Sequence, residues 1–284
     1  MNIDYFRSFV ETVNQKSLSK ASERLNISQP ALSKQIRKLE DFFDAPLLVR
    51  STSGVVLTEA GELVYKRLPQ ILGDLSILQN DLNSLKEIRS YRVGTLPSLA
   101  GNYIPSRILK LKEKGIHVEV VIKNASQEVF ELLKNGEIDA AIIEEMPVNK
   151  TYWQKEIFEE PLYAILRTSH KLSGNQSVQI EEISDEEFVL YPSFCTIRES
   201  VSRMFREQEK ELKIIREIDF GDFLIGYVAA GSGITVVPEM SIKNLGNSFV
   251  KAIPLNHSSA KRTISLIANS NTTGKALYPF FKKR

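Results

Sequence analysis

The stretch NISQPALSKQIRKLE, from Asn26 to Glu40, decides how the first part of this chain folds. Apolar side chains recur along it at steps of four and three residues, which is the spacing of one buried face of an α-helix. These apolar positions are Leu32, Ile36, Leu39 and Phe43. Ser28 is a favoured N-cap residue, and Pro30 is tolerated in a first helical turn. The stretch therefore predicts an amphipathic helix that begins near Ser28.

The opposite face of this helix carries polar and basic side chains, namely Gln29, Ser33, Lys34, Arg37 and Lys38. Arginine and lysine bind phosphates, while glutamine, serine and arginine can hydrogen-bond base edges in the major groove of DNA. A solvated surface helix is the alternative interpretation of the same pattern. The neighbouring segments favour DNA.

Two helical patterns precede this helix, and a pair of short strands follows it. The first pattern is marked by Phe6, Phe9, Val10 and Val13, and the second by Leu18, Ala21 and Leu25. Asn26 and Ile27 make a tight turn into the third helix, so the three helices predict a helix-turn-helix. Leu47–Val49 and Val55–Leu57 predict a small hairpin, or wing, with Arg50 at its rim.

The run from Ser17 to Glu62 resembles the winged helix-turn-helix of LysR-type transcriptional regulators. The resemblance is carried by Ala21, Leu25, Ser28-Gln29-Pro30, Ser33, Leu39-Glu40, Arg50 and the exit Leu57-Thr58-Glu59-Ala60-Gly61. Two residues depart from the family pattern. Asp44 stands where glycine is usual and Leu48 where phenylalanine is usual, and both concern packing at the turn into the wing.

The resemblance implies that double-stranded DNA, at an operator with dyad symmetry, is the partner of this head. It implies that Gln29, Ser33, Lys34 and Arg37 face the major groove, with phosphate contacts from Ser19 and Arg50. The full expected DNA-binding set is Ser19, Ser28, Gln29, Pro30, Ser33, Lys34, Arg37, Lys38 and Arg50. Lys38 also fits a purely solvated position. If the protein activates transcription, RNA polymerase becomes a further partner.

A heptad pattern follows the wing. Its apolar residues are Val64, Leu68, Ile71, Leu75, Leu78, Leu82 and Leu85. Such a stripe predicts a coiled-coil seam with a second copy of the chain, and packing on the chain's own C-terminal body is the alternative. Thr58 can cap this helix, whereas Pro69 lies inside the stripe and should kink it. The resemblance implies a linker helix that pairs antiparallel with its mate, in a homodimer or homotetramer.

From Tyr91 onward the chain alternates predicted strands and helices. Continuous apolar strands, such as Asp139–Ile143 and Ile234–Val237, indicate parallel sheets that are covered on both faces. This part exceeds the commonest size of a single domain, so two α/β lobes are expected. Segments near Leu162–Arg167 and Ile264–Ala268 are expected to cross between the lobes.

The resemblance extends to this part, which is similar to the periplasmic-binding-protein-like effector domain of the same family. The expected fold is α/β overall. A winged helix-turn-helix occupies residues 1–58, a linker helix and hinge residues 59–90, and an effector-binding domain of two α/β lobes residues 91–284. Lobe I is expected to take about residues 91–163 and 264–284, and lobe II about residues 164–263.

Two such lobes leave a cleft at the carboxyl ends of their strands, where ligands bind in open α/β sheets. Three segments there, 95–98, 124–126 and 192–196, each precede a predicted helix whose N-terminus can attract an anion. The expected effector-binding residues are Thr95, Pro97, Ser98, Asn124, Ser126, Pro192, Ser193, Phe194 and Thr196. The resemblance implies effector contacts at Ser98, Ser126, Pro192 and Phe194. As an alternative, the hydroxyl groups serve only as helix caps.

The charge of the three segments bears on the kind of effector. They contain no acidic residue, which favours a small anionic metabolite. Glu144 and Glu145 follow the third predicted strand, and either would favour an amine if it reached the cleft. Modification of the thiol of Cys195 is a third alternative. As the only cysteine, Cys195 cannot form an internal disulfide, and a buried inert thiol is the better interpretation.

Other classes of protein fit less well. The histidines His117, His170 and His257 lack metal-ligand spacing, so no metal or cofactor is expected. Gly231-Ser232-Gly233 precedes a strand instead of a helix and lacks the last glycine of a dinucleotide motif, and no GxSxG motif is present, so no enzyme is expected. A solute-binding protein is the non-regulator alternative, although the N-terminal head argues against it.

The composition is that of an ordinary globular protein, with 42% hydrophobic and 25% charged residues among 284. A net charge of +2 does not by itself indicate nucleic acid, so DNA binding must rest on local placement. No signal peptide is visible, and the longest uncharged run, Phe223–Pro238, is too short to span a membrane. The expected location is the cytoplasm.

Overall fold

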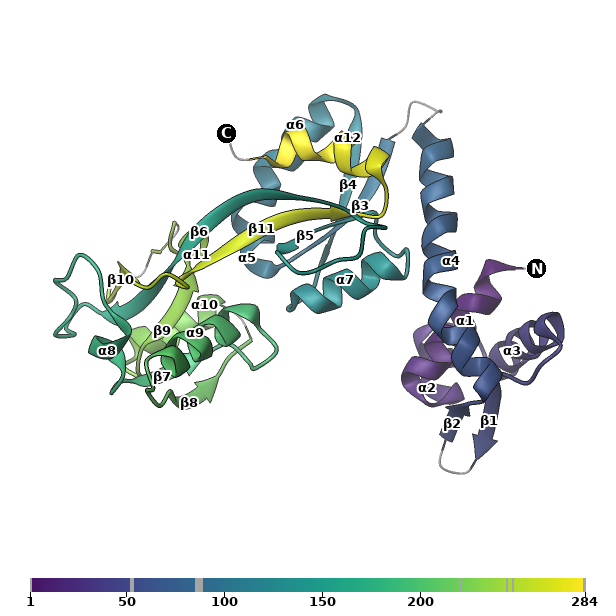
Figure 1. The fold of residues 1–284 in the computed structure, drawn as a ribbon, viewed down its shortest axis with the longest axis horizontal. Coiled ribbons are helices and arrows are strands. Elements are labelled where there is room, and N and C mark those ends of the chain that lie inside the picture. The colour runs from purple at the N-terminus through teal and green to yellow at the C-terminus, as the bar shows by residue number, and fades with distance from the viewer. Residues whose placement is uncertain are drawn as a thin grey trace. The chain divides into compact units, whose positions relative to one another are not determined.

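The computed structural model describes residues 2–51, 54–84, 89–219, 221–243, 245–246 and 248–282 (Figure 1). The chain separates into two compact units. The first is built on residues 1–76, and the second on residues 77–284 without the short segment Lys134–Gly136. The first unit therefore includes much of the segment 59–90, which was expected to be a linker and dimerisation helix with a hinge.

The first unit contains the three expected helices and the wing. They are α1 (Ile3–Gln15), α2 (Leu18–Arg24), α3 (Gln29–Phe43), β1 (Leu48–Ser51) and β2 (Gly54–Leu57). Ser28 caps α3 by accepting a hydrogen bond from the N–H of Ala31 at 3.3 Å. Leu32, Ile36 and Leu39 are fully buried in the core of the head, as their spacing predicts. Phe43, the fourth residue of the predicted buried face, is instead 36% exposed, because it lies at the last residue of α3.

The turn from α3 into the wing explains the residues found there. Asp44 adopts a left-handed conformation with φ of 49°, which is the conformation that favours glycine. Glu40 holds the turn, because its Oε1 accepts the N–H groups of Leu47 at 2.9 Å and Leu48 at 3.2 Å. A Cβ on Gly61 would lie 2.0 Å from the carbonyl oxygen of Leu47, so this position requires glycine.

Helix α4 spans Glu59–Ser84, so the helix continues past Pro69. Whether the helix bends at Pro69, as the sequence predicts, stays a prediction. Thr58 caps it as predicted, since Thr58 Oγ1 accepts the N–H of Gly61 at 2.9 Å. The first turns of the predicted seam pack on the head of the same chain, which neither the seam with a second copy nor packing on the C-terminal body had predicted. Leu68 is 1% exposed in the core of the head, and Val64 packs beside it. Ile71, Leu78 and Leu82 are exposed, and Leu85 lies outside the described residues.

The second unit is organised by a mixed sheet with the strand order β10-β6-β11-β5-β3-β4, and β9 also pairs with β6. Its strands are β3 (Arg89–Thr95), β4 (Ile116–Ile122), β5 (Ala140–Glu144), β6 (Trp153–Arg167), β9 (Thr235–Pro238), β10 (Val250–Pro254) and β11 (Lys261–Ala268). Only β3 with β4 and β3 with β5 are parallel pairs in this sheet. The expectation of parallel sheets throughout is therefore wrong, because β6 and β11 return antiparallel to their neighbours.

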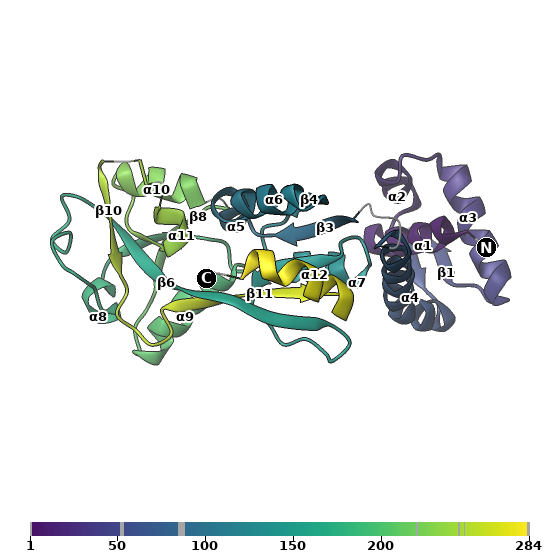
Figure 2. The ribbon, with the colours of Figure 1, turned by 90° about the horizontal axis from the view of Figure 1, so that it is seen from above.

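Two hydrophobic clusters divide this unit into lobes. Lobe I is the cluster that includes Tyr91–Phe158 and Ile264–Phe281, and lobe II is the cluster from Leu162 to Ala260. Strands β6 and β11 run side by side from one lobe to the other, as expected (Figures 1 and 2). Met240 departs from the expected division, since it packs in the core of lobe I.

Helices cover the strands of both lobes. In lobe I they are α5 (Pro97–Asn102), α6 (Ile104–Glu113), α7 (Ser126–Lys134) and α12 (Asn271–Phe281). Figure 1 shows α7 on the side of the sheet away from α6 and α12. Lobe II contains α8 (Ile180–Ile183), β7 (Glu187–Leu190), α9 (Thr196–Glu207), β8 (Lys213–Glu217), α10 (Gly221–Ala229) and α11 (Glu239–Ile242). Strands β7 and β8 form a separate parallel pair.

Candidate functional site

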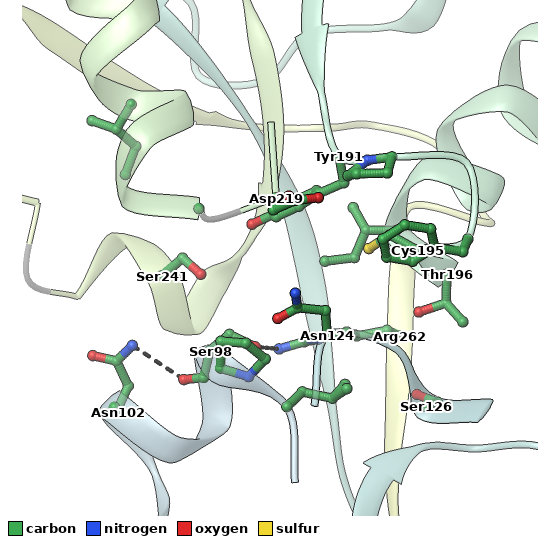
Figure 3. A pocket seen from close by; sticks show the side chains of 18 of the residues that line it. Ser98, Asn102, Asn124, Ser126, Tyr191, Cys195, Thr196, Asp219, Ser241 and Arg262 are labelled. Atoms are coloured by element: carbon green, nitrogen blue, oxygen red, sulfur yellow. Dashed lines mark hydrogen bonds between the residues drawn. The ribbon is translucent and has the colours of Figure 1, made fainter. Parts of the chain in front are cut away.

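A cavity of about 500 Å³ lies between lobe I and lobe II (Figure 3). Lobe I contributes the residues that precede and begin α5 and α7, and lobe II contributes those that precede and begin α9 and α10. The crossing strand β11 contributes Arg262. The cavity thus lies where helix N-termini from both lobes meet, and its volume is typical of a site for a small molecule.

Most of the residues that the sequence predicted for this cleft line the cavity. They are Pro97, Ser98, Asn124, Ser126, Pro192, Phe194 and Thr196. Thr95 does not, because it is fully buried within lobe I and its hydroxyl donates to the carbonyl of Ile142 at 2.9 Å. Ser193 is not among the lining residues either, and its side chain is exposed to solvent.

Neither serine of lobe I in the cavity wall caps its own helix. Helix α5 has no side-chain cap, and Ser98 Oγ instead accepts a hydrogen bond from Arg262 Nη2 at 3.1 Å. Ser126 is 5% exposed, and its hydroxyl oxygen is buried without a hydrogen-bond partner among the described residues. Leaving a buried hydroxyl unpaired is unfavourable, so this group suits a ligand. The alternative of simple helix caps does not describe these two residues.

Arg262 is a site residue that the sequence interpretation missed. It forms a buried ion pair with Glu160 on β6, with 2.6 Å between Arg262 Nη2 and Glu160 Oε1. The two side chains are 2% and 1% exposed, and Glu160 Oε2 also accepts the N–H of Met240 at 2.8 Å. The pair is directly opposed in the β6–β11 register. That register depends on the tertiary fold, so local sequence patterns gave no signal for it.

Glu144, at the end of β5, accepts a hydrogen bond from the hydroxyl of Thr196 at the start of α9. This contact connects lobe I to lobe II beside the cavity. Burial raises the pKa of Glu144, while the hydrogen bond from Thr196 and the charge of Arg262 act in the opposite direction. Glu160 and Glu199 add to the rise in the pKa of Glu144 through repulsion.

Cys195 precedes α9 and also lines the cavity. Burial raises the pKa of its thiol, although backbone N–H groups of Arg198 and Ile197 favour the thiolate. A raised pKa leaves less of the thiol as the nucleophilic thiolate, which weighs against the alternative of thiol modification.

In the first unit, the outer face of α3 carries the polar residues expected at DNA. Gln29, Pro30, Lys34, Arg37 and Lys38 are exposed, and Ser33 is half-buried. The exposed hydroxyl of Ser19 on α2 donates to Gln29 Oε1 at 3.1 Å. The side chain of Arg50 lies outside the described residues. Helix α3 therefore presents hydrogen-bonding and cationic groups on one accessible face.

No group of three or more His, Cys, Asp and Glu side chains in the described residues is arranged to hold a metal ion. No helix in the same part of the chain is long and apolar enough to cross a membrane.

Both parts of the chain match models of known protein families. Residues 3–62 match the bacterial regulatory helix-turn-helix protein of the lysR family, and residues 86–281 match the LysR substrate binding domain. The chain belongs to the LysR family. Regulators of this family bind DNA, take up effectors in the substrate-binding domain and form oligomers. The chain is therefore a LysR-type transcriptional regulator and not a solute-binding protein.

Relatives match this LysR-type regulator over nearly its whole length. The transcriptional dual regulator GltC of Bacillus subtilis is 27% identical over 95% of this chain and 92% of its own. The nitrogen assimilation regulatory protein nac of Escherichia coli is 28% identical over 97% of this chain and 92% of its own. The structure of full-length BenM is 26% identical, with a TM-score of 0.61 over 99% of this chain and 95% of BenM. A full-length OxyR from Pseudomonas aeruginosa, 22% identical, shares the fold with a TM-score of 0.71 over 99% of this chain and 94% of its own.

Proposed function

We propose that this LysR-type regulator is controlled by a small metabolite with an anionic group, bound in the cavity between lobes I and II. The observation that carries the proposal is the hydroxyl of Ser126, which is buried in the cavity wall without a partner among the described residues. It lies at the first residue of α7, where free backbone N–H groups and the helix dipole favour negative charge.

The effector acts by biasing the arrangement of the two lobes. Ser98 and Ser126 belong to lobe I and Thr196 to lobe II, so a ligand that contacts both sides favours the arrangement in which they converge. A ligand shifts such an equilibrium only through its different affinities for the two states. The proposal assigns no cofactor and no catalytic step to the cavity.

At the DNA, we infer that Gln29 and Ser33 contact base edges, while Lys34, Arg37 and Arg50 contribute charge near phosphates. The exposed positions of the α4 stripe, Ile71, Leu78 and Leu82, pair with a second copy and hold two heads on an operator with dyad symmetry. Binding to a bacterial chromosome would require that the protein work in the cytoplasm.

The effector proposal is tested by calorimetry on the full-length protein with a panel of metabolite carboxylates and amines. We expect a carboxylate to bind, and Ser126→Ala to weaken it by about 1.5–3 kcal/mol, because a hydrogen bond to a charged group is lost. Ser193→Ala is the matched control, since that serine is exposed outside the cavity. Both variants should bind operator DNA as the wild type does. Binding of amines alone, or an unchanged response of Ser126→Ala, would refute the proposal.

A further inference from the structure

The two sides of the cavity differ in the hydrogen-bonding groups they offer. On the lobe I side, Arg262 Nη2 donates to Ser98 Oγ, so the Ser98 hydroxyl keeps its own proton free to donate into the cavity. Ser126 adds a second hydroxyl that has no partner among the described residues. Ser126 is the first residue of α7, whose free N–H groups at the helix start are also donors. This side therefore presents donors.

The lobe II side presents acceptors. The hydroxyl of Thr196 donates its hydrogen bond to Glu144, so Thr196 Oγ1 can only accept a hydrogen bond from a ligand. Asp219, between β8 and α10, also lines the cavity and carries a carboxylate. Figure 3 shows Asp219 across the cavity from Ser98 and Asn124. A carboxylate accepts hydrogen bonds and attracts a cation.

The charged side chains of the cavity wall also indicate that the lobe II side attracts a cation. Among the described lining residues, Asp219 and Arg262 are the charged ones. Arg262 is already neutralised by Glu160, in a pair whose side chains are 2% and 1% exposed. Asp219 has no ion pair within the described part of the chain, so its charge is the one left uncompensated. A simple carboxylate would gain from the serines but would be repelled by Asp219.

We propose that the effector is a zwitterion of the amino acid class, with its carboxylate at Ser98 and Ser126 and its ammonium group at Asp219 and Thr196. The inference rests on the proposed function, since it deepens the chemistry of the same cavity. Asp219 is then a specificity-determining residue, which selects an amino acid over the corresponding hydroxy acid. Thr196 contributes a neutral acceptor that an ammonium group can use.

The test uses full-length protein and calorimetry with matched sets of probes. Each set contains a standard L-amino acid, the 2-hydroxy acid with the same side chain, and the amine that lacks the carboxylate. We expect an amino acid to bind at least about tenfold more tightly than either analogue, because each analogue leaves one charged partner unpaired. Asp219→Asn should abolish the preference over the hydroxy acid. Glu211→Gln, which removes an exposed charge of lobe II outside the cavity, should leave the preference unchanged.

The possible failures are distinct. If hydroxy acids or other carboxylates bind as well as amino acids, and Asp219→Asn tightens them, the zwitterion is refuted while the anion cavity stands. If only amines bind, both the zwitterion and the anionic effector are refuted. If no probe in any set binds, the amino acid class is refuted. The proposed function is then tested by the broader carboxylate panel: binding of a carboxylate supports it, and binding of amines alone refutes it.

Discussion

Thr196 donates a hydrogen bond to the carboxylate of Glu144, and this contact ties the start of α9 in lobe II to the end of β5 in lobe I. Burial raises the pKa of Glu144, with Thr196 and Arg262 acting against the rise. The folded protein therefore holds a proton on Glu144 more tightly than the unfolded chain does. This makes the stability of the effector-binding unit dependent on pH.

We expect Glu144→Gln to stabilise this unit at neutral pH. Because the pKa is raised on folding, the stability linked to Glu144 is fully present below the unfolded value of 4.5 and is lost as pH rises through the folded value. Glutamine keeps an acceptor for Thr196 without acquiring charge. The melting temperature of the variant should exceed that of the wild type near pH 7, and the difference should vanish as the pH falls to about 4. Glu145→Gln, at an exposed neighbour, is the control. A difference that does not vary with pH would contradict this account.

The ion pair between Arg262 and Glu160 should be the costliest one to break. Glu160→Gln leaves the Arg262 charge buried without its partner, which typically costs about 3–5 kcal/mol. An exposed ion pair that lies diagonally across the same two strands provides a matched control. Lys261 and Glu159 form an ion pair at 3.0 Å with side chains 53% and 45% exposed, so Glu159→Gln should cost less than about 1 kcal/mol. Denaturant unfolding would measure both, and equal losses would show that Arg262 finds another partner.

The sequence predicted local features well because they depend on nearby residues. The buried face of α3, the Ser28 cap and the Thr58 cap follow from spacing and side-chain chemistry within one or two helical turns. Most of the effector-binding residues predicted between a strand and a helix also line the cavity, because strand ends gather at one edge of a sheet.

The errors have tertiary causes. Thr95 is the last residue of β3, where a shift of one residue decides whether a side chain faces the core or the cleft. Arg262 and Asp219 lie on a crossing strand and in a loop of lobe II, and only the fold brings them to the same cavity. The direction of β6 and β11 is set by their passage between lobes, which local patterns do not encode.

Helix α4 should contain two kinds of apolar position with different roles. Leu78 is 54% exposed within the chain, so Leu78→Asp should dissociate the oligomer by placing a charge in the seam while the monomer stays folded. Leu68 is 1% exposed in the head, so Leu68→Asp should instead unfold the helix-turn-helix unit. Sedimentation velocity and circular dichroism would separate these effects. If Leu78→Asp sediments as the wild type does, the seam does not use this position.

The last prediction concerns how α3 distinguishes operator from other DNA. Ser19 donates to Gln29 Oε1 at 3.1 Å, which fixes the amide of Gln29 on the accessible face of the helix. Gln29→Ala should therefore weaken operator binding by about 1–3 kcal/mol and leave binding to random DNA nearly unchanged, because base contacts carry sequence information and phosphate contacts do not. Arg50→Ala should weaken binding to both DNAs and reduce the slope of log affinity against log salt by about 1, as expected for one lost phosphate contact. Gel-shift titrations at two salt concentrations would measure the affinity of each variant for operator and for random DNA, and the salt dependence of both. Equal losses of Gln29→Ala on operator and random DNA would show that Gln29 positions the head without reading a base.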